Sequence, residues 1–502
     1  MSNIYRHYLN GKPIQSTAEQ FSKVYNPATG QVISQVPIAT TSELQSAVAY
    51  AKDAFVSWAE TPAARRARVM FKLLDLLNAN IDRMAELVTH EHGKTFDDAK
   101  GEVMRGIEIV EFATGIPFHQ SGQFSDNIAN GVDQYQLRMP LGVTAGITPF
   151  NFPIMIPLWM SAMSIACGNA FILKPSERDP GVSMILADLM TQAGVPAGVF
   201  QVLHGDKTCV DGLLDHPDVR AMSFVGSTPI AKYIYHRGAA LGKRVQALGG
   251  AKNHMVIMPD ADMDKAADAL MGAGYGAAGE RCMAISVAVP VGKTTADTLI
   301  EALEPRVRRL KIGSGMEPGI EMGPLISAEA HERITGLINS GVQAGAELVV
   351  DGRDFKPSGL EGGFFMGGTL FDKVTTEMEI YRQEIFGPVL SIVRSENLEH
   401  ATSLVTNHEF GNGTAIFTRD GGVARHFARA VEAGMVGINV PIPVPTAWSS
   451  FGGWKSSLFG DTHMYGPEGV KFWTRQKNVM TRWPNTSFDQ MTGAFNFGAS
   501  AG

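Results

Sequence analysis

Residues 143–174 read VTAGITPFNFPIMIPLWMSAMSIACGNAFILK, and this stretch shows the pattern that indicates the fold. An apolar run, a loop and a helical segment follow one another here and again up to Ala251. The runs that predict strands are Val143–Ile147, Ala170–Leu173, Phe200–Leu203 and Met222–Val225, with a helix predicted at Val182–Gly194. Such alternation is typical of a parallel sheet with helices on both faces.

A second alternating region runs from His254 to about Val440. Its predicted strands are His254–Met258, Ala284–Val289, Val389–Val393 and Thr414–Phe417. The fold class is therefore predicted to be α/β, with two parallel-sheet domains. Within residues 125–143, Tyr135, Leu137 and Met139 alternate with Gln136 and Arg138, which predicts a strand in an arm projecting from the body. Val470–Val479 predicts a further strand.

Two helical features precede the first sheet. Ser42 and Gln45 resemble a capping box at the start of a helix. A long helical pattern covers Phe96 to about Thr114, and Arg105 lies on it close to the apolar stripe. An arginine at such a position is unusual, although most of these snorkel or pair with a carboxylate.

Composition excludes several classes of function. The chain has 502 residues, a net charge of −7 and no basic run interleaved with aromatic residues, so neither nucleic acid nor a membrane surface is expected as a partner. Three widely spaced cysteines, Cys167, Cys209 and Cys282, predict no disulfide framework and no metal site. The N-terminus lacks the apolar core of a signal peptide, and a cytoplasmic location is expected.

One of these cysteines stands in a special context, Gly279-Glu280-Arg281-Cys282-Met283, between small residues and an apolar run. A cation at Arg281 would favour the thiolate, the reactive form of cysteine. The alternative is that Cys282 is a small buried hydrophobic residue. Residues 274–279 match G-x-G-x-x-G formally, but a helical pattern precedes them, so we reject a dinucleotide fingerprint there.

Polar residues follow several of the predicted strands, where ligands bind in parallel sheets. Asn151 could donate to an oxyanion near a reactive thiol. Lys174 and Glu177 could bond ribose hydroxyls, and the carboxylate favours NAD over NADP. Each of these residues, like Gly226-Ser227 and Glu384, could equally be an ordinary turn, cap or surface residue when it is considered alone.

Taken together, the motifs resemble the aldehyde dehydrogenase superfamily over nearly the whole chain. The matching segments are PFNFP (149–153), LKPSE (173–177), FVGS (224–227), the Cys282 segment, EIFGPV (384–389) and FGGWK (451–455). The resemblance implies Cys282 as the nucleophile and Asn151 in the oxyanion hole. It also implies NAD contacts from Phe150, Lys174, Glu177, Gly226, Ser227, Glu384 and Phe386.

The resemblance also implies a division of the chain. Residues 1–124 and 144–252 would form the NAD-binding domain, and 253–445 the catalytic domain. An oligomerisation arm and C-terminal strand would comprise 125–143 and 446–486, and a flexible tail 487–502. A homotetramer or homodimer is expected from this arm.

The segment QALGGAKNH (246–254) departs from the hydrolytic members of the superfamily, which carry a water-activating glutamate in Glu-Leu-Gly-Gly-Lys. Depending on the alignment, Leu248 or Ala247 takes its place. Ala231, where many relatives have glycine, is a second departure. The chain is most similar to the CoA-acylating malonate/methylmalonate semialdehyde dehydrogenases. That similarity assigns Arg105 and Arg281 to the substrate carboxylate and coenzyme A as co-substrate.

The expected reaction is oxidation of the semialdehyde through a thioester on Cys282, with loss of CO₂ and transfer to CoA. Two alternatives remain open. A hydrolytic aldehyde dehydrogenase would release a free acid with Glu280 or another group as base. A non-catalytic binding or structural protein on the same scaffold is the other alternative.

Overall fold

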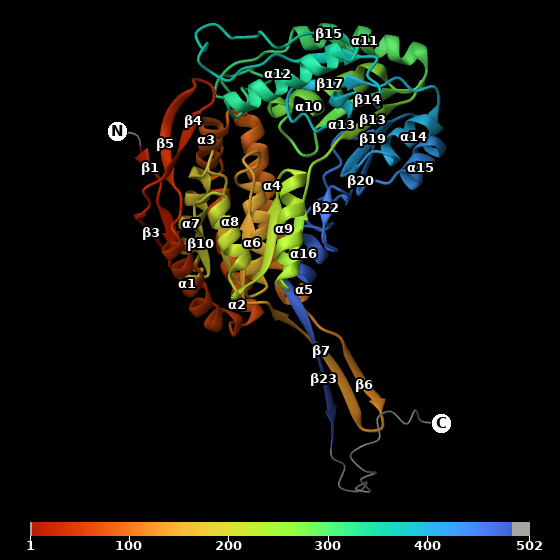
Figure 1. The fold of residues 1–502 in the computed structure, drawn as a ribbon. Coiled ribbons are helices and arrows are strands. Elements are labelled where there is room, and N and C mark those ends of the chain that lie inside the picture. Colours follow the sequence, from red (N-terminus) through yellow and green to blue (C-terminus); the bar gives the residue numbers. More distant parts are fainter. Residues whose placement is uncertain (1–2, 484–502) are drawn as a thin grey trace.

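The computed structural model describes residues 3–483, and strands from distant parts of this range form one eight-stranded sheet (Figure 1). Its five central strands are parallel, as the sequence predicts, and the strands at both edges run antiparallel to their neighbours. The order is β22 (Leu458–Phe459), β12 (Arg244–Leu248), β11 (Val219–Val225), β8 (Val143–Ile147), β9 (Ala170–Lys174), β10 (Phe200–Val202), β2 (His7–Leu9) and β3 (Lys12–Ile14).

Helices cover both faces of this sheet because the central strands are apolar on both sides. One face packs against α6 (Met155–Ala166) and α7 (Gly181–Ala193), and a further layer of α2 (Ala63–Asn78), α3 (Ile81–His92) and α4 (Phe96–Thr114) packs on these two helices. The other packs against α1 (Thr41–Ala59), α8 (Lys207–Asp215) and α9 (Thr228–Ala240). Helix α4 begins where Thr95 accepts a hydrogen bond from the Asp98 amide, and its bounds match the predicted ones.

A second, seven-stranded sheet forms the other large body in Figure 1. Its order is β15 (Glu347–Val350), β16 (Thr369–Asp372), β17 (Val389–Ile392), β14 (Ile285–Pro290), β13 (Asn253–Ile257), β19 (Gly413–Phe417) and β20 (Met435–Ile438), with only β15 antiparallel. The flanking helices are α10 (Met263–Tyr275), α11 (Lys293–Arg308), α12 (Ala328–Gln343), α13 (Glu379–Arg382), α14 (Leu398–Thr406) and α15 (Gly421–Ala430). The predicted α/β class with two sheets is confirmed.

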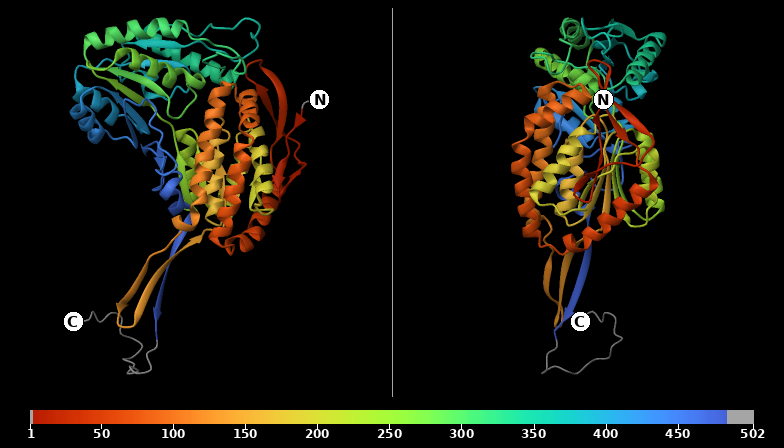
Figure 2. Two further views of the ribbon diagram at one scale, coloured as in Figure 1. Left: turned by 180° about the vertical axis from the view of Figure 1, so that it is seen from behind. Right: turned by 90° about the vertical axis from the view of Figure 1, so that its left-hand side faces the viewer.

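A three-stranded arm leaves the body, as both views in Figure 2 show. It consists of β6 (Phe124–Ala129), β7 (Val132–Pro140) and β23 (Thr474–Arg482), and β23 pairs with β7 along its full length. Part of the stretch 446–486, which the sequence assigned to the arm, lies elsewhere. Strand β22 pairs with β12, and β21 (Trp454–Lys455) pairs with β18 (Phe410–Gly411). The predicted tail, 487–502, lies outside the described residues.

The strand predicted at Val470–Val479 is wrong in its first four residues. They end the helix α16 (Gly466–Trp473), and the strand begins only at Thr474. Val470, Phe472 and Trp473 are buried in the core that also contains α6. Their spacing fits one apolar side of a short helix as well as it fits a strand, and the packing decides for the helix.

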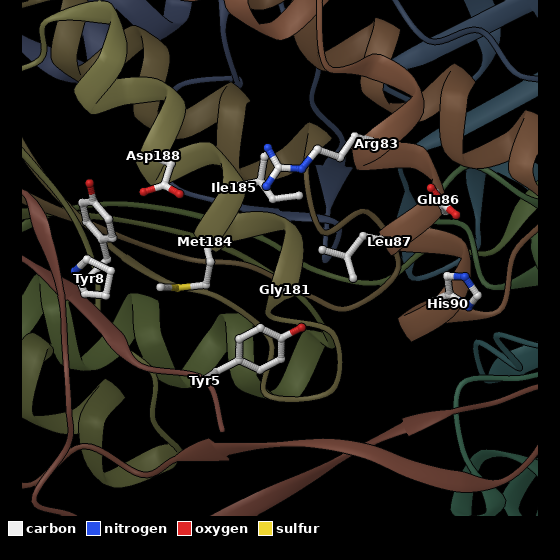
Figure 3. Close-up of a pocket in the computed structure, with 11 residues that line it drawn as sticks. Tyr5, Tyr8, Arg83, Glu86, Leu87, His90, Gly181, Met184, Ile185 and Asp188 are labelled. Carbon is white, nitrogen blue, oxygen red and sulfur yellow. The ribbon is translucent and has the colours of Figure 1, made fainter. Parts of the chain in front are cut away.

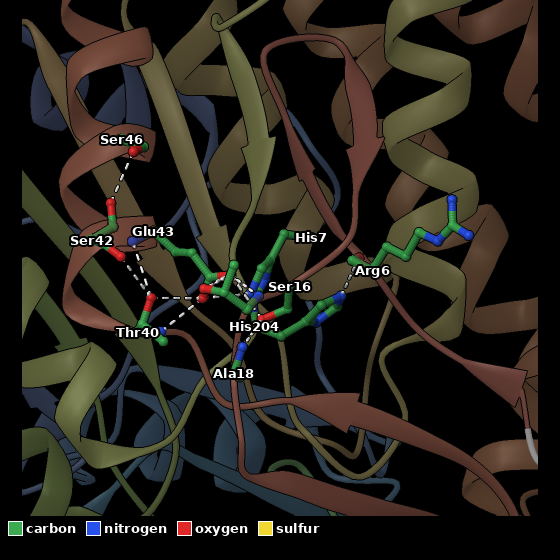
Figure 4. A network of polar contacts seen from close by, with 10 residues as sticks. Arg6, His7, Ser16, Ala18, Thr40, Ser42, Glu43, Ser46 and His204 are labelled. Carbon is green, nitrogen blue, oxygen red and sulfur yellow. Dashed lines mark hydrogen bonds and ion pairs between the residues drawn. The ribbon is translucent and has the colours of Figure 1, made fainter.

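The N-terminal segment is fastened to α1 by one carboxylate (Figure 4). Glu43 accepts hydrogen bonds from Ser16 and from the Thr17 and Thr40 amides. Thr40 and Glu43 form the capping box of α1, so the prediction of Ser42 with Gln45 was wrong by two residues. An ionised carboxylate accepts hydrogen bonds more strongly than the neutral amide of Gln45, which explains why Glu43 completes the capping box. Nearby, β4 (Phe21–Asn26), β5 (Gln31–Pro37) and β1 (Asn3–Ile4) form a small separate sheet.

Between residues 3 and 483, no helix combines the length and the apolar character needed to cross a bilayer. The remaining short helix, α5 (Ile116–His119), connects α4 to the arm.

Candidate active site

Cys282 lies on a short loop between the two bodies, after the 3-10 turn η1 (Gly276–Gly279) and before β14. Its carbonyl oxygen accepts hydrogen bonds from the side-chain amides of Asn253, at 2.9 Å, and Asn412, at 3.0 Å. Gly279 has a positive φ, and a Cβ there would lie 2.1 Å from the Gly387 carbonyl oxygen. A side chain at position 279 would collide with the Gly387 carbonyl, so the conformation of this loop requires glycine there. A helix, α10, precedes the glycines, in agreement with the rejection of a dinucleotide fingerprint.

The Cys282 thiol is half-buried, and its environment disfavours the thiolate. Burial, followed by the nearby Glu384 carboxylate, raises the pKa of Cys282 to about 12. Arg281 lowers this pKa, as expected of a neighbouring cation, but burial and Glu384 outweigh it. The guanidinium of Arg281 is paired with Asp98 on α4.

Asn151 lies beside the Cys282 loop. Its side-chain Nδ2 donates to the Glu280 carbonyl oxygen at 3.0 Å, and the residue is buried. The two predicted catalytic residues thus come from different sheets and meet through this bond. One Nδ2 hydrogen is used by Glu280, and the amide group has a second hydrogen that it could offer to a ligand. The oxyanion role of Asn151 stays a prediction.

A cavity of about 370 Å³ opens at the carboxyl ends of β8, β9 and β11. Four predicted cofactor contacts line it: Phe150, Lys174, Glu177 and Gly226. Lys174 Nζ donates to Glu177 Oε2 at 2.8 Å. Burial opposes ionisation of Glu177, but this ammonium outweighs it and the pKa is lowered, so the side chain is a carboxylate at neutral pH. Ser227 occupies the N-cap position of α9 next to Gly226 without a side-chain cap hydrogen bond. Backbone amides at a helix start can bind phosphate, although Pro229 offers none here and the Ile230 amide bonds to the Ser227 carbonyl.

The remaining predicted contacts, Glu384 and Phe386, line a small hollow together with Arg281 and Cys282. Glu384 Oε1 accepts from the Ala251 amide at 2.9 Å, and burial raises its pKa to about 7. Lys252 Nζ donates to the carbonyl oxygens of Ile380 and Gln383, which holds the turn that carries Glu384.

The two residues that stand where a glutamate would activate water face opposite sides of β12. Leu248 is buried in the core that also contains Met283 and contacts Cys282. Ala247 is buried in the other core, on the α9 side, together with Ala231. The strand alternation therefore directs position 248, not 247, toward the side of Cys282.

The two predicted carboxylate-binding arginines have partners from α4 and share no contact. Arg105 Nη1 donates to Glu108 at 2.7 Å, and its Nη2 donates to the carbonyl oxygens of Val444 and Pro445. Arg281 pairs with Asp98. Arg105 and Cys282 nevertheless lie on the same side of the molecule, because both act on Tyr465. Burial raises the pKa of Tyr465, Arg105 lowers it and Cys282 raises it.

Sequence reasoning missed several residues that hold the site. Asn253 and Asn412 bind the Cys282 carbonyl, and the fully buried Lys94 binds the loop of Asn151. No local motif marks them, because each acts on a residue far away in the chain. Asn253 belongs to the segment 246–254, which is unusual because it lacks the water-activating glutamate, but that feature does not predict this contact.

A hollow of about 450 Å³ lies between the N-terminal strands and helices α3 and α7, and none of the predicted site residues lines it (Figure 3). Its lining includes Tyr5, Leu87 and Met184. Within residues 3–483, no group of three or more His, Cys, Asp or Glu side chains is arranged to hold a metal ion.

Known proteins resemble this chain along almost its whole length. The sequence model of the aldehyde dehydrogenase family matches residues 14–479. The malonate-semialdehyde dehydrogenase of Pseudomonas aeruginosa is 56% identical over 478 residues, 95% of this chain and 96% of the relative. The acylating, mitochondrial methylmalonate-semialdehyde dehydrogenase of Arabidopsis thaliana is 48% identical over 95% of this chain and 78% of the relative.

A solved structure agrees with these relatives. It is a Sinorhizobium meliloti 1021 protein, provisionally named a methylmalonate-semialdehyde dehydrogenase and complexed with NAD. It is 57% identical, with a TM-score of 0.96, and the match covers 97% of this chain and 99% of that one.

Proposed function

The chain belongs to the aldehyde dehydrogenase family, and we propose that it oxidises malonate semialdehyde or methylmalonate semialdehyde with NAD⁺. We further propose that the acyl group loses CO₂ and passes to coenzyme A as acetyl-CoA or propionyl-CoA. The names of the relatives support the substrate class, and the Arabidopsis relative is named as acylating. The observation that carries the proposal is that Cys282 is held in place and that Leu248, an apolar residue in the core against which Cys282 packs, stands where a base would be needed.

The cavity after β8, β9 and β11 fits the adenosine part of NAD⁺. It lies where ligands bind in parallel sheets, and the ionised Glu177 suits ribose hydroxyls but would repel a 2′-phosphate. Phe150, Lys174, Glu177 and Gly226 would hold the cofactor there, with Glu384 and Phe386 near its reactive end, and it would supply the hydride acceptor. A complex of a 57% identical protein with NAD supports this assignment.

In the first half-reaction, the sulfur of Cys282 attacks the aldehyde carbon and a hemithioacetal oxyanion forms. The second amide hydrogen of Asn151 and the backbone N–H of Cys282 are the donors we assign to this oxyanion. A single donor of this kind typically lowers the barrier by about 3 kcal/mol. Removal of hydride from the same carbon leaves a thioester on Cys282. Because burial raises the pKa of the free thiol to about 12, its proton has to pass to solvent before the sulfur attacks.

The thioester of a β-carboxylate substrate is a malonyl unit, and the C–C bond to the carboxylate then breaks. The electron pair passes into the thioester carbonyl as an enolate, CO₂ leaves, and the enolate carbon takes a proton. The same oxyanion donors serve this enolate. Arg105 is the better placed of the two arginines to recognise the carboxylate, since its Nη2 binds only neutral carbonyls, which a carboxylate outcompetes.

In the second half-reaction, the thiol of CoA attacks the thioester and releases Cys282. Water is the competing nucleophile and needs a base. Neither Leu248 nor Ala247 can act as one, and this supports a thioester that survives until CoA arrives.

The hydrolytic alternative needs a carboxylate near the thioester, and Glu280 is poorly placed for this role. It is buried, and its Oε1 accepts from the Ile326 amide at 3.4 Å. Burial raises its pKa to about 8, although the Ile326 amide and Arg178 lower it. The carboxylate that influences Cys282 is Glu384, with a pKa of about 7. Hydrolysis, if it occurs, would use Glu384.

Product analysis tests the proposal. NADH formation from malonate semialdehyde is followed with and without CoA, and the products are identified by mass. We expect CO₂ and CoA-dependent acetyl-CoA. Malonate formed equally well without CoA would overturn the acylating function and favour the hydrolytic one.

We also propose assembly through the arm into a dimer or tetramer. β6 and β23 each pair with β7 on one side only, and among the described residues no strand pairs with their outer edges. Phe124, Met480 and Trp483 are more than half exposed, at 64%, 64% and 62%. A three-stranded sheet exposed on both faces is marginally stable alone. Light scattering of the full chain gives the mass, and a monomer would contradict this assignment.

A further inference from the structure

Lys94 is a fully buried lysine that no part of the proposed reaction uses. It stands between α3 and α4, and 1% of its side chain is exposed. Its Nζ donates to Glu102 Oε2 at 2.8 Å and to the backbone carbonyl oxygen of Asn151 at 2.6 Å, and it lies 4.5 Å from the centre of the Phe152 ring. An ammonium without water keeps its charge only where such partners surround it.

The carboxylate partner extends this contact to the next helix. Glu102 Oε1 accepts from the amides of Ile154 and Met155, at 2.9 and 3.2 Å, which begin α6. One buried ion pair therefore holds the turn 151–155 at both ends, by its first carbonyl and by its last two amides. The turn has no other ionic contact among the described residues.

The same turn carries the side chain of Asn151 to the Cys282 loop, where Nδ2 donates to the Glu280 carbonyl oxygen. The backbone of Asn151 is thus tied to Lys94, and its side chain to the nucleophile loop. A small rotation of this turn would move the amide relative to the thiol, and misplacing a reacting group by about 1 Å can cost about 100-fold in rate.

We propose that Lys94, held by Glu102, is a positioning residue that aims the amide of Asn151 at the oxyanion formed on Cys282. This rests on the proposed function, because it needs Asn151 as an oxyanion donor. Lys94 itself touches neither substrate nor thiol. Its removal should lower the rate of thioester formation with little change in the binding of aldehyde or NAD⁺.

The test uses the full-length protein and the Lys94→Met variant, which keeps the length of the side chain and removes the ammonium. The first readout is the pre-steady-state burst of NADH, expected to be about 10- to 100-fold slower with KM for the aldehyde within twofold. The second is alkylation of Cys282 by iodoacetamide, a displacement that forms no oxyanion, and its rate should stay within twofold. An unchanged burst, or a burst and an alkylation rate that fall together, would overturn the proposal.

Two further variants separate the possible failures. Lys94→Met combined with Glu102→Gln leaves no unpaired buried charge and replaces the single variant if that does not fold. Lys94→Met combined with Asn151→Ala should be no slower than Asn151→Ala alone, and a further loss would show that Lys94 acts elsewhere. A wild-type rate in Asn151→Ala itself would instead reject Asn151 as oxyanion donor.

Lys243→Met is the matched control. This lysine also donates to two backbone carbonyl oxygens, those of His216 and Val219, each at 2.6 Å. It directly precedes Arg244, the first residue of β12, and so lies at the other end of this strand from Leu248. Its burst rate should equal that of the wild type, and a loss like that of Lys94→Met would count against the specific role.

Discussion

The rings of Phe150 and Phe386 meet edge to face, with centroids 5.9 Å apart and planes at 87°. Phe150 follows β8 of the first sheet, and Phe386 precedes β17 of the second. The contact therefore joins the wall of the nucleotide cavity to the hollow that contains Cys282. An extended dinucleotide that reaches from the cavity to Cys282 would run along this aromatic pair.

Phe386→Leu should remove this aromatic pair while preserving an apolar side chain. An aromatic pair of this kind contributes about 0.5–1.5 kcal/mol, so KM for NAD⁺ should rise about two- to tenfold. Steady-state kinetics at saturating aldehyde measures it. Phe459→Leu is the control, since Phe459 packs against Tyr235 and lines neither the cavity nor the hollow of Cys282. An unchanged KM for NAD⁺ in Phe386→Leu would contradict the role.

Leu248→Glu should convert part of the product from acyl-CoA to free acid. The new carboxylate would lie on the Cys282 side of β12, and a general base there should raise hydrolysis of the thioester by about 10- to 100-fold. Acid release is measured by mass without CoA. Ala247→Glu is the matched control, because that side chain faces the other core and should destabilise the protein without raising hydrolysis. Unchanged acid release in both variants would refute our explanation of the missing base.

Glu384→Gln should make Cys282 more reactive toward iodoacetamide at pH 8. Glu384 has a pKa of about 7, so it is charged at pH 8 and raises the pKa of the thiol. Removing the charge lowers that pKa, and each unit gives about a tenfold larger thiolate fraction. At pH 6 the wild-type carboxyl is mostly protonated, and the two alkylation rates should converge. A constant ratio from pH 6 to pH 8 would exclude this electrostatic origin.

Arg105→Gln should weaken recognition of the carboxylate and leave neutral aldehydes unaffected. A charge-assisted hydrogen bond contributes about 1.5–3 kcal/mol, so KM for malonate semialdehyde should rise about 10- to 100-fold. Propanal, which lacks the carboxylate, should keep its KM. Arg68→Gln, at an exposed position of α2, is the control. Equal losses with both aldehydes would mean that Arg105 only supports the 444–445 loop.

Glu43→Gln should lower the melting temperature at neutral pH, because the capping box contributes about 1 kcal/mol. Burial opposes the shift, but the hydrogen bonds from Thr40, Thr17 and Ser16 lower the pKa of Glu43 from 4.5 to about 2. A depressed pKa stabilises the fold above 4.5, and this contribution is lost as pH falls from 4.5 toward 2. The difference from wild type should therefore be constant from pH 7 to 5 and shrink below 4.5. Glu19→Gln, exposed on the same segment, should show no such trend.

The strands could be predicted from sequence because their signals are local, while the nucleophile stays a prediction. The bounds of Val143–Ile147 are confirmed to the residue, and the helix predicted from Phe96 to about Thr114 ends at Thr114. Long-range pairing was out of reach: Asp98 neutralises Arg281, and Lys94 holds Asn151, across large separations in the chain. Local pattern also failed at Val470–Trp473, where four residues cannot distinguish a strand from the end of a helix.

The pairing of β23 with β7 sets a limit on when this protein can finish folding. Trp483 Nε1 donates to Asp133 across 350 residues of sequence. During synthesis, β7 therefore leaves the ribosome long before its partner exists. Until then, an exposed strand edge can recruit a neighbouring nascent chain, and such long-range pairing forms slowly. Translation speed and chaperone supply, rather than final stability, should therefore limit the yield of native protein.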